Sequence, residues 1–468
     1  MTCFTRFLLL TLLLMPMAHV QAQVAHTDTS AHQWSARQAF DDYLEAYNSA
    51  DRQKLEEFVE RYEYDETVET LLAHREATGG FDLLDIEIDS PKLVIAHLRW
   101  RSGQMYENRR ITTIGDGPGP GVRITGNNLP IARLDMEDAL AGLADRAATL
   151  EEQDMFSGTI LVARHGEVLF EKAYGMADRE QQIPTSLDTR LRYASVGKMF
   201  TSVALLQLVD EGKVHLDGTV SDYIPDYPNQ DFARNVKVRH LLTHEAGAGD
   251  IDAIDPDWQG DRSTFKTLDD YLNAYGNRAP DFEPGSKGQY SNNGFMLLGS
   301  IIEAVTGQNF HDVIQAKIFD PSGMTRSGYE PETVAVENRP PPYRKIDGKW
   351  TNILEDYPWR GTPAGGGYST VRDLYKFATA LQSGKLISDG LFRQAIKPQN
   401  KEGWYGFGFV TFESDGQWQY GHGGGAPGSS SWLYVYPDSG YITAALSNLD
   451  PPAAYDALNW FAPRMPVD

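Results

Sequence analysis

The residues that could do chemistry in this chain begin with Ser195 and Lys198, which are three positions apart. On a helix this spacing brings the lysine side chain back to the face that carries the serine hydroxyl. A basic group beside a serine hydroxyl can turn a weak nucleophile into an acylating one. A second Ser-x-x-Lys begins at Ser263, so the pattern carries little weight without its setting. Because Ser263 precedes only a short surface helix, we expect Ser195 to carry the acyl group.

The element that must position this pair is the apolar run at residues 199–209. A helix that is apolar nearly all round is a buried one, and Gly212 supplies a C-terminal stop. The pattern therefore predicts Ser195 at the N-terminus of a central helix. Free N–H groups and the helix dipole favour a developing negative charge there.

Two further motifs carry polar groups into suitable settings. Tyr290-x-Asn292 lies on a loop rich in proline and glycine that leads into an apolar helix, where the pair could face a cavity. The run from His422 to Gly425 is predicted to lie between two short strands. Glycines in such a place let a ligand approach the backbone closely and leave N–H groups free.

In this order the three motifs resemble the penicillin-recognising serine hydrolases, and most closely the class C β-lactamase-related branch with its D,D-carboxypeptidases, D-aminopeptidases and esterases. The resemblance implies that Ser195 forms an acyl-enzyme. It also implies that Lys198 and Tyr290 share the proton transfer, with the ammonium favouring the phenolate; the sequence leaves open which of them is the base. Asn292 would bind the substrate. The N–H groups of Ser195 and Gly425 would form the oxyanion hole.

His422 stands where this family often has a lysine that grips a substrate carboxylate. Histidine carries only part of a charge near neutrality. This departure favours an esterase, or a peptidase or amidase, over an efficient β-lactamase. The expected substrate is a small ester, amide or peptide. The alternative from another class is a non-catalytic sensor or binder of peptidoglycan-type ligands on the same fold.

The fold class expected is α+β, in two domains. In residues 131–468, strand-like segments at both ends enclose a helical middle, which predicts one antiparallel sheet built from the two ends of a β-lactamase/transpeptidase-like domain. Residues 23–130 show helices first and strands after, the pattern of a small α+β module that resembles the NTF2-like or cystatin-like ones. The chain has no Gly-x-Ser-x-Gly elbow, which argues against an α/β-hydrolase.

Residues 1–22 have the pattern of a signal peptide: Arg6, a short apolar core, and small residues at its end. About nine apolar residues are too few for a bilayer, which needs about 20. We therefore expect a periplasmic or secreted protein with no membrane span after the signal is removed. The one cysteine, Cys3, falls in this segment, so no disulfide or thiol nucleophile is expected afterwards.

The formal charge of −23 argues against nucleic acid or an anionic membrane as a partner. His240 and His244 share a helical face, but they form no His-Glu-x-x-His motif and lack an evident third ligand. No metal and no cofactor are expected. The oligomeric state is left open.

Overall fold

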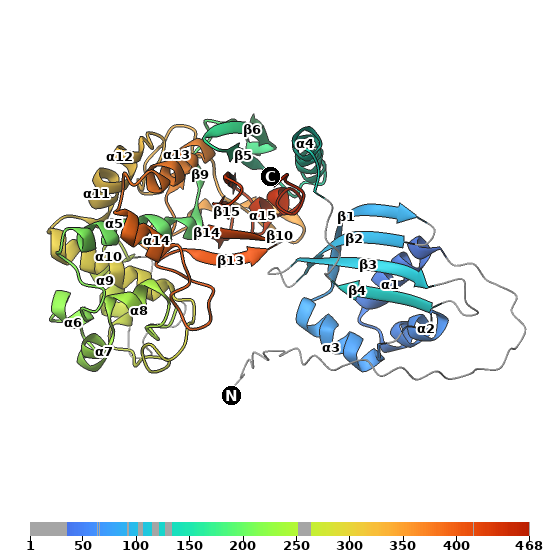
Figure 1. Cartoon of the computed structure of the whole chain (residues 1–468), viewed down its shortest axis with the longest axis horizontal. Helices are drawn as coiled ribbons and strands as arrows, with labels where there is room; N and C mark the ends of the chain where they lie inside the picture. Colours follow the sequence, from blue (N-terminus) through green and yellow to red (C-terminus); the bar gives the residue numbers. More distant parts are fainter. Residues whose placement is uncertain are drawn as a thin grey trace, which may run out of the picture. The chain divides into compact units, whose positions relative to one another are not determined.

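The computed structural model describes residues 35–62, 64, 66–90, 93–101, 106–114, 121–126, 133–250, 264–414 and 416–467. The chain divides into two compact units, Met1–Asn128 and Leu129–Asp468 (Figure 1). The expected signal segment and Ser263 lie outside the described residues. Within the described ranges, no helix is both long enough and apolar enough to cross a bilayer.

The described part of the first unit has three helices followed by a four-stranded meander, β1-β2-β3-β4, so the small α+β module is present. Its core pairs two periodicities. Phe40, Tyr43 and Tyr47 recur at helical spacing, whereas Val94 and Leu98 alternate along a strand, and all five are buried in one cluster. The elements are α1 (Ala36–Ser49), α2 (Arg52–Tyr62), α3 (Val68–Thr78), β1 (Phe81–Ser90), β2 (Leu93–Trp100), β3 (Tyr106–Ile114) and β4 (Gly121–Gly126).

The second unit is built on a six-stranded antiparallel sheet in the order β13-β14-β15-β16-β5-β6. The last strand of the chain pairs with the first of the unit, with Ser447 opposite Gly158, so the sheet formed by both ends is confirmed. The strands are β5 (Gly158–Arg164), β6 (Glu167–Tyr174), β13 (Val410–Ser414), β14 (Gln417–Ala426), β15 (Ser429–Tyr436) and β16 (Tyr441–Ser447).

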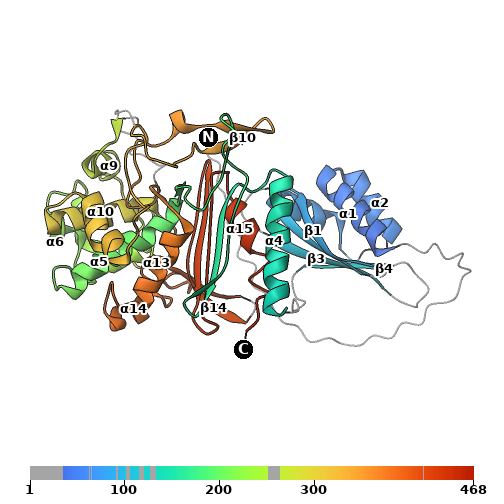
Figure 2. The same cartoon turned by 90° about the horizontal axis from the view of Figure 1, so that it is seen from above.

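Helices cover both faces of this sheet (Figure 2). Along β5, Leu161 and Ala163 join the cluster that contains α5, whereas Ile160 and Val162 join the cluster that contains α4 and α15. This alternation is the two-residue period of a strand buried on both sides. The sheet therefore separates two cores, and α5 lies in the larger one.

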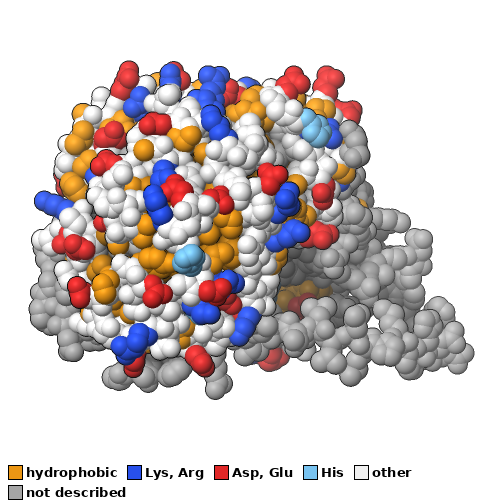
Figure 3. Space-filling view, turned by 60° about the vertical axis from the view of Figure 1, so that its left-hand side comes forward, with side chains coloured by type: hydrophobic (Ala, Val, Ile, Leu, Met, Phe, Trp, Pro, Cys, Tyr) orange, Lys and Arg blue, Asp and Glu red, His pale blue; other side chains and the backbone are white. Residues whose placement is uncertain are grey.

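The helical middle supplies that larger core. α5 buries nearly every side chain from Lys198 to Leu206, as its apolar sequence predicts. Acidic and basic side chains are interspersed over the helical side of the unit, and hydrophobic ones gather near its middle (Figure 3). The helices are α4 (Met136–Glu152), α5 (Gly197–Asp210), α6 (Val220–Tyr223), α7 (Gln230–Asn235), α8 (Val238–Leu242), α9 (Leu268–Tyr275), α10 (Asn292–Thr306), α11 (Phe310–Ile314), α12 (Asp320–Ser322), α13 (Val371–Gln382), α14 (Asp389–Ala395) and α15 (Ala453–Leu458).

Short strand pairs connect the helices to the sheet. In one of them β9, which ends three residues before Ser195, pairs with β12. Arg192 then lies opposite Tyr368. It brings the loop before residue 368 to the start of α5. The pairs are formed by β7 (Met176–Asp178), β8 (Ile183–Pro184), β9 (Leu191–Arg192), β10 (Tyr343–Ile346), β11 (Lys349–Asn352) and β12 (Tyr368–Ser369).

Candidate active site

Ser195 lies in a short 3₁₀ turn, Ala194–Val196, that leads directly into α5. Ala194 has a φ of 43°, a left-handed conformation that residues with a Cβ rarely adopt. The buried hydroxyl of Ser431 donates to the Tyr193 carbonyl at 2.6 Å and ties this turn to β15. Ser195 is therefore held, partly exposed, where the first N–H groups of a helix have no partner within the helix.

Lys198 lies in the first turn of α5 and is fully buried. Its Nζ is 3.3 Å from Ser195 Oγ. The same nitrogen is 2.7 Å from Asn292 Oδ1 and 2.5 Å from the Ala364 carbonyl oxygen. Three segments that are far apart in the sequence thus meet at one amine.

Burial lowers the pKa of Lys198 from 10.5 to about 7, while the charge of Asp250 acts in the opposite direction. The cause is the loss of water around an ammonium whose hydrogen-bond partners are the uncharged oxygens of Ser195, Asn292 and Ala364. Near neutral pH a large fraction of Lys198 is therefore the free amine, which has a lone pair to accept a proton.

The Tyr290 ring lies beside this amine, with its centroid 4.7 Å from Lys198 Nζ. Burial raises the pKa of the Tyr290 phenol well above its ordinary value of 10.0, and its hydrogen bond with Ser195 only partly opposes the shift. The phenol therefore stays protonated at neutral pH. The expectation that the ammonium would favour the phenolate is wrong here, because burial disfavours both charged forms more than their proximity favours them.

Asn292 begins α10 and is held from two sides. Its Oδ1 accepts from Lys198, and its Nδ2 donates to Asp250 Oδ1 at 2.8 Å. Sequence reasoning missed Asp250, because the only signal was a carboxylate after the glycine-rich turn at 247–249. The pair of bonds fixes the amide orientation and leaves one Nδ2 hydrogen for a substrate.

The loop at residues 362–367 completes the surroundings of Lys198. Besides the Ala364 carbonyl, it supplies the Pro363 carbonyl, which accepts from Thr201 one turn further along α5 at 2.7 Å. Gly365 has a φ of 144°, and a Cβ there would lie 2.5 Å from the Ala194 carbonyl oxygen. The contact of Ala364 with the lysine is visible only in three dimensions.

His422 is buried, and both of its ring nitrogens have protein partners. Nε2 lies 3.0 Å from the Tyr405 hydroxyl, and Nδ1 contacts the Gly423 carbonyl. Because a carbonyl can only accept, Nδ1 carries the proton and Nε2 accepts from Tyr405. Burial and the charge of Lys198 lower the pKa of His422 to about 3. The expected substrate-binding side chain is thus a neutral imidazole with no free ring nitrogen.

The glycines after His422 lie inside β14, which corrects the prediction that they fall between strands. In the partner strand β15, Trp432 lies opposite Gly423, Ser431 opposite Gly424 and Ser430 opposite Gly425. A Cβ at Gly424 would lie 2.8 Å from the Ser195 nitrogen, so this strand needs glycine because another backbone approaches it. Gly425 is exposed at this edge.

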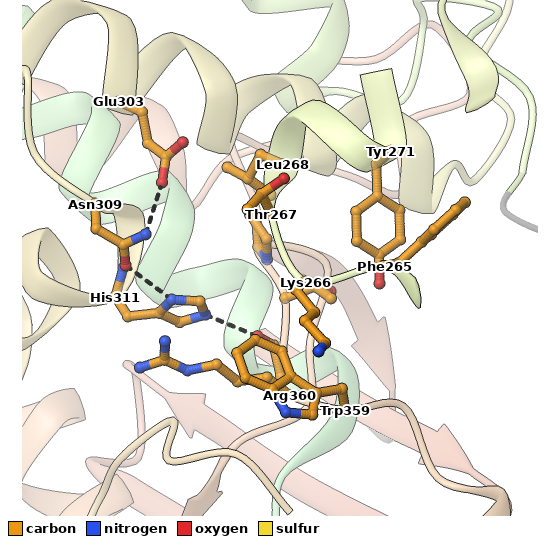
Figure 4. A pocket seen from close by; sticks show the side chains of 13 residues that line it. Phe265, Lys266, Thr267, Leu268, Tyr271, Glu303, Asn309, His311, Trp359 and Arg360 are labelled. Carbon is orange, nitrogen blue, oxygen red and sulfur yellow. Dashed lines mark hydrogen bonds between the residues drawn. The ribbon is translucent and has the colours of Figure 1, made fainter. Parts of the chain in front are cut away.

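A hollow of about 360 Å³, including space open to solvent, lies next to the loop at residues 362–367. None of the motif residues line it (Figure 4). Three of its polar side chains, those of Glu303, Asn309 and His311, are hydrogen-bonded in a row. The His311 ring bridges Asn309 Oδ1 at 3.0 Å and the Gly361 carbonyl at 2.9 Å, and Asn309 also donates to Glu303. The bond from His311 to the Gly361 carbonyl holds the residue just before the loop at 362–367. In the parts of the chain described, no three His, Cys, Asp or Glu residues are grouped to hold a metal ion.

Comparison with known proteins places this geometry among hydrolases. The sequence profile described as Beta-lactamase matches residues 140–464. Esterase EstB from Burkholderia gladioli is 30% identical, over 64% of this chain and 85% of its own. A D-aminopeptidase from Brucella anthropi is 29% identical, over 63% of this chain and 56% of its own. The crystal structure of a penicillin binding protein from Bacillus halodurans is 31% identical, with a TM-score of 0.61, and covers 67% of this chain and 97% of its own.

Proposed function

This chain belongs to the beta-lactamase family and is a serine hydrolase; from that premise we propose that it hydrolyses a small ester or amide through an acyl-enzyme on Ser195. The observation that carries the proposal is the hydrogen-bonding pattern of Lys198. The two shorter contacts of its Nζ go to oxygens of Asn292 and Ala364, which can only accept. They take both hydrogens of the neutral amine, so its lone pair points to Ser195.

In the acylation step, Lys198 takes the Ser195 proton as the oxygen bonds to the substrate carbonyl carbon. The negative charge that forms on the carbonyl oxygen is met by the N–H groups of Ser195 and Gly425. Tyr290, whose phenol stays protonated, donates to the leaving alkoxide or amide nitrogen, and the Lys198 proton replaces the one it gives. The carbon–oxygen or carbon–nitrogen bond of the substrate then breaks.

Deacylation follows by the same groups in reverse. A water gives its proton to the base and adds to the acyl carbon, and Ser195 leaves with a proton from Lys198. Each step conserves protons, so the site returns to its starting state. No metal or cofactor enters the scheme.

The substrate we propose is a neutral ester first and an amide or small peptide second. The name of the esterase relative supports the ester, and that of the D-aminopeptidase supports the amide. A substrate carboxylate would find no fixed positive charge at residue 422, because the imidazole there is buried and neutral. Efficient β-lactam hydrolysis is therefore disfavoured. The pattern of residues 1–22 supports export, to the periplasm or outside the cell.

The test uses a fluorophosphonate probe, which forms a Ser O–P bond and releases fluoride. Purified wild type is expected to be labelled at Ser195 by peptide mapping, whereas Ser195→Ala loses the label and Ser286→Ala, at an exposed loop serine, keeps it. Label on Ser263, or none at all, contradicts the proposal and favours the non-catalytic binder. Turnover of p-nitrophenyl esters, a chromogenic cephalosporin, D-amino-acid amides and a D-Ala-D-Ala peptide then ranks the substrates.

A further inference from the structure

Beneath Tyr290 lies a second buried histidine, His244, for which the proposed reaction has no use. Its side chain is 1% exposed. Its ring centroid is 4.4 Å from that of Tyr290 and 4.4 Å from that of Tyr405. The Trp404 ring is nearly parallel to it at 6.0 Å. The imidazole thus forms part of the surface on which the Tyr290 ring lies.

Hydrogen bonds connect His244 to the residues on both sides of Tyr290. The His244 ring accepts the Ser291 backbone N–H at Nδ1, at 3.1 Å. The His244 carbonyl accepts the Gln289 backbone N–H at 2.8 Å. The backbone on each side of the tyrosine is therefore bonded to this one residue. A displacement of the Tyr290 backbone away from Lys198 would have to break these bonds.

The conformation of His244 itself indicates that this arrangement is constrained. Its φ is 61°, in the left-handed region, although it carries a Cβ. Its Nε2 is buried and has no hydrogen-bond partner among the residues that the structure describes. Because Nδ1 accepts from Ser291, the proton of the neutral ring belongs on Nε2. Strained backbone and an unpaired buried polar group both cost stability and persist where a site requires them.

We propose that His244 is a positioning residue, which holds Tyr290 and Ser291 so that the phenol faces Ser195 and Lys198. The inference rests on the proposed function, since it assigns Tyr290 a part in proton transfer. His244 acts through its Nδ1, which accepts from Ser291, and its ring packs against Tyr290. These two contributions can be separated by substitution.

His244→Asn keeps an acceptor close to the position of Nδ1 but removes the ring, whereas His244→Phe keeps a ring but removes the acceptor. We expect His244→Phe to lower kcat about 100-fold with little change in KM, because a catalytic group displaced by about 1 Å loses about that factor. His244→Asn is expected to stay within about fivefold of wild type, because the acceptor survives. The second-order rate of fluorophosphonate labelling should follow the same order.

His240→Phe is the matched control, since His240 lies in α8, just before His244 in the chain, and its Nδ1 accepts the Lys237 backbone N–H at 3.3 Å. It is expected to lower Tm without lowering the labelling rate. Equal losses in His244→Phe and His244→Asn, or wild-type labelling in His244→Phe, would overturn the proposal.

If His244→Phe does not fold, the wild-type protein still decides the question. Long-range ¹H–¹⁵N spectra of histidine-labelled protein at pH 7 should show His244 protonated at Nε2 and unprotonated at Nδ1. Protonation at Nδ1 would contradict the bond to Ser291. Wild type that fails to label at Ser195 would instead refute the proposed function, so the two failures are distinct.

Discussion

At the scale of the residue, the proposed chemistry depends on how far burial lowers the pKa of Lys198. Its ammonium would be surrounded by protein oxygens and aromatic rings rather than water, which lowers its pKa to about 7. The unfolded lysine keeps its proton up to about pH 10.5. Between these values the unfolded state binds more protons than the folded one, so this group makes folding stability rise with pH over that interval. Below about pH 7 the contribution is constant.

The first prediction concerns the pH dependence of acylation. Because Lys198 must be the free amine to accept a proton, kcat/KM for a neutral ester should fall as pH drops below about 7, about tenfold per unit well below the pKa. His422 cannot cause this limb, since its pKa is about 3. The measurement is kcat/KM from pH 5 to 9. A rate that is flat from pH 5 to 9 would show that Lys198 is not the base.

Asp250 provides the second prediction, because its charge raises the pKa of Lys198. Asp250→Asn removes the charge and keeps an oxygen that can accept from Asn292. The acid limb of kcat/KM should therefore move to lower pH, with the plateau within about tenfold of wild type. Asp281→Asn, at an exposed aspartate paired with Arg278, is the control and should leave the limb in place. A shift to higher pH in Asp250→Asn would contradict the electrostatic assignment.

At the scale of the element, two segments pack closely against the start of α5. The loop at 362–367 brings the Ala364 carbonyl to Lys198, and His311 braces this loop at Gly361. On the other side, β14 passes so close to Ser195 that Gly424 has no room for a side chain. The geometry around Ser195, the proposed nucleophile, is thus set by close backbone contacts at Gly365 and Gly424 that leave no room for a Cβ.

The third prediction tests the loop. Gly365→Ala would place a Cβ 2.5 Å from the Ala194 carbonyl oxygen at a φ of 144°, so the loop must move away from α5. Displacing the Ala364 carbonyl frees one amine hydrogen, and kcat should fall about 10- to 100-fold. The control is Gly390→Ala, at an open position in α14, which should leave kcat unchanged and stabilise slightly. Equal activity of the two variants would show that the loop does not determine how Lys198 acts as the base.

The fourth prediction concerns β14. In wild type, the Tyr405 hydroxyl donates to the neutral imidazole of His422. His422→Lys would put an ammonium at this buried position instead. We expect turnover of a neutral ester to fall, and any gain to appear only with carboxylate-bearing substrates. The comparison is kcat/KM for one neutral ester and one D-Ala-D-Ala-type peptide in both proteins, from pH 5.5 to 8.5. A wild type that prefers the anionic peptide would overturn the choice of a neutral substrate.

At the scale of the whole molecule, the second unit closes its own sheet and holds every residue of the candidate site. Its two cores lie on opposite faces of that sheet, and in the described ranges each is built from residues of this unit. The first unit has a core of its own, to which α1 and β2 contribute. Such a division is typical of domains that fold independently.

The fifth prediction follows from this division. A protein that begins near Ile131 should be monodisperse, unfold cooperatively and label at Ser195, because it keeps both cores. Thermal unfolding, size-exclusion chromatography and probe labelling of the truncated and full-length proteins provide the comparison. Recovery of the shorter protein only as aggregate would show that the two units share a core.

The sequence by itself determined the elements and the chemical groups. Apolar periodicity placed α5 and α10, alternation and turn residues placed the strands of both sheets, and the order of three motifs indicated the hydrolase. These signals are local, because a helix or strand buries a face that repeats along the chain. The limit of such reasoning appears at His422–Gly425, where glycines that read as a connection lie in β14. Only the backbone that approaches them explains why a strand needs glycine there.

Tertiary structure alone decided how the groups work. Whether Lys198 or Tyr290 is suited to be the base depends on burial, and the burial of Lys198 comes from residues up to 166 positions away in the chain. Asp250, the Ala364 carbonyl and the ring of His244 likewise had no pattern of their own. A pKa reflects the loss of water and the nearby charges in three dimensions, and neither is written in the spacing of a motif.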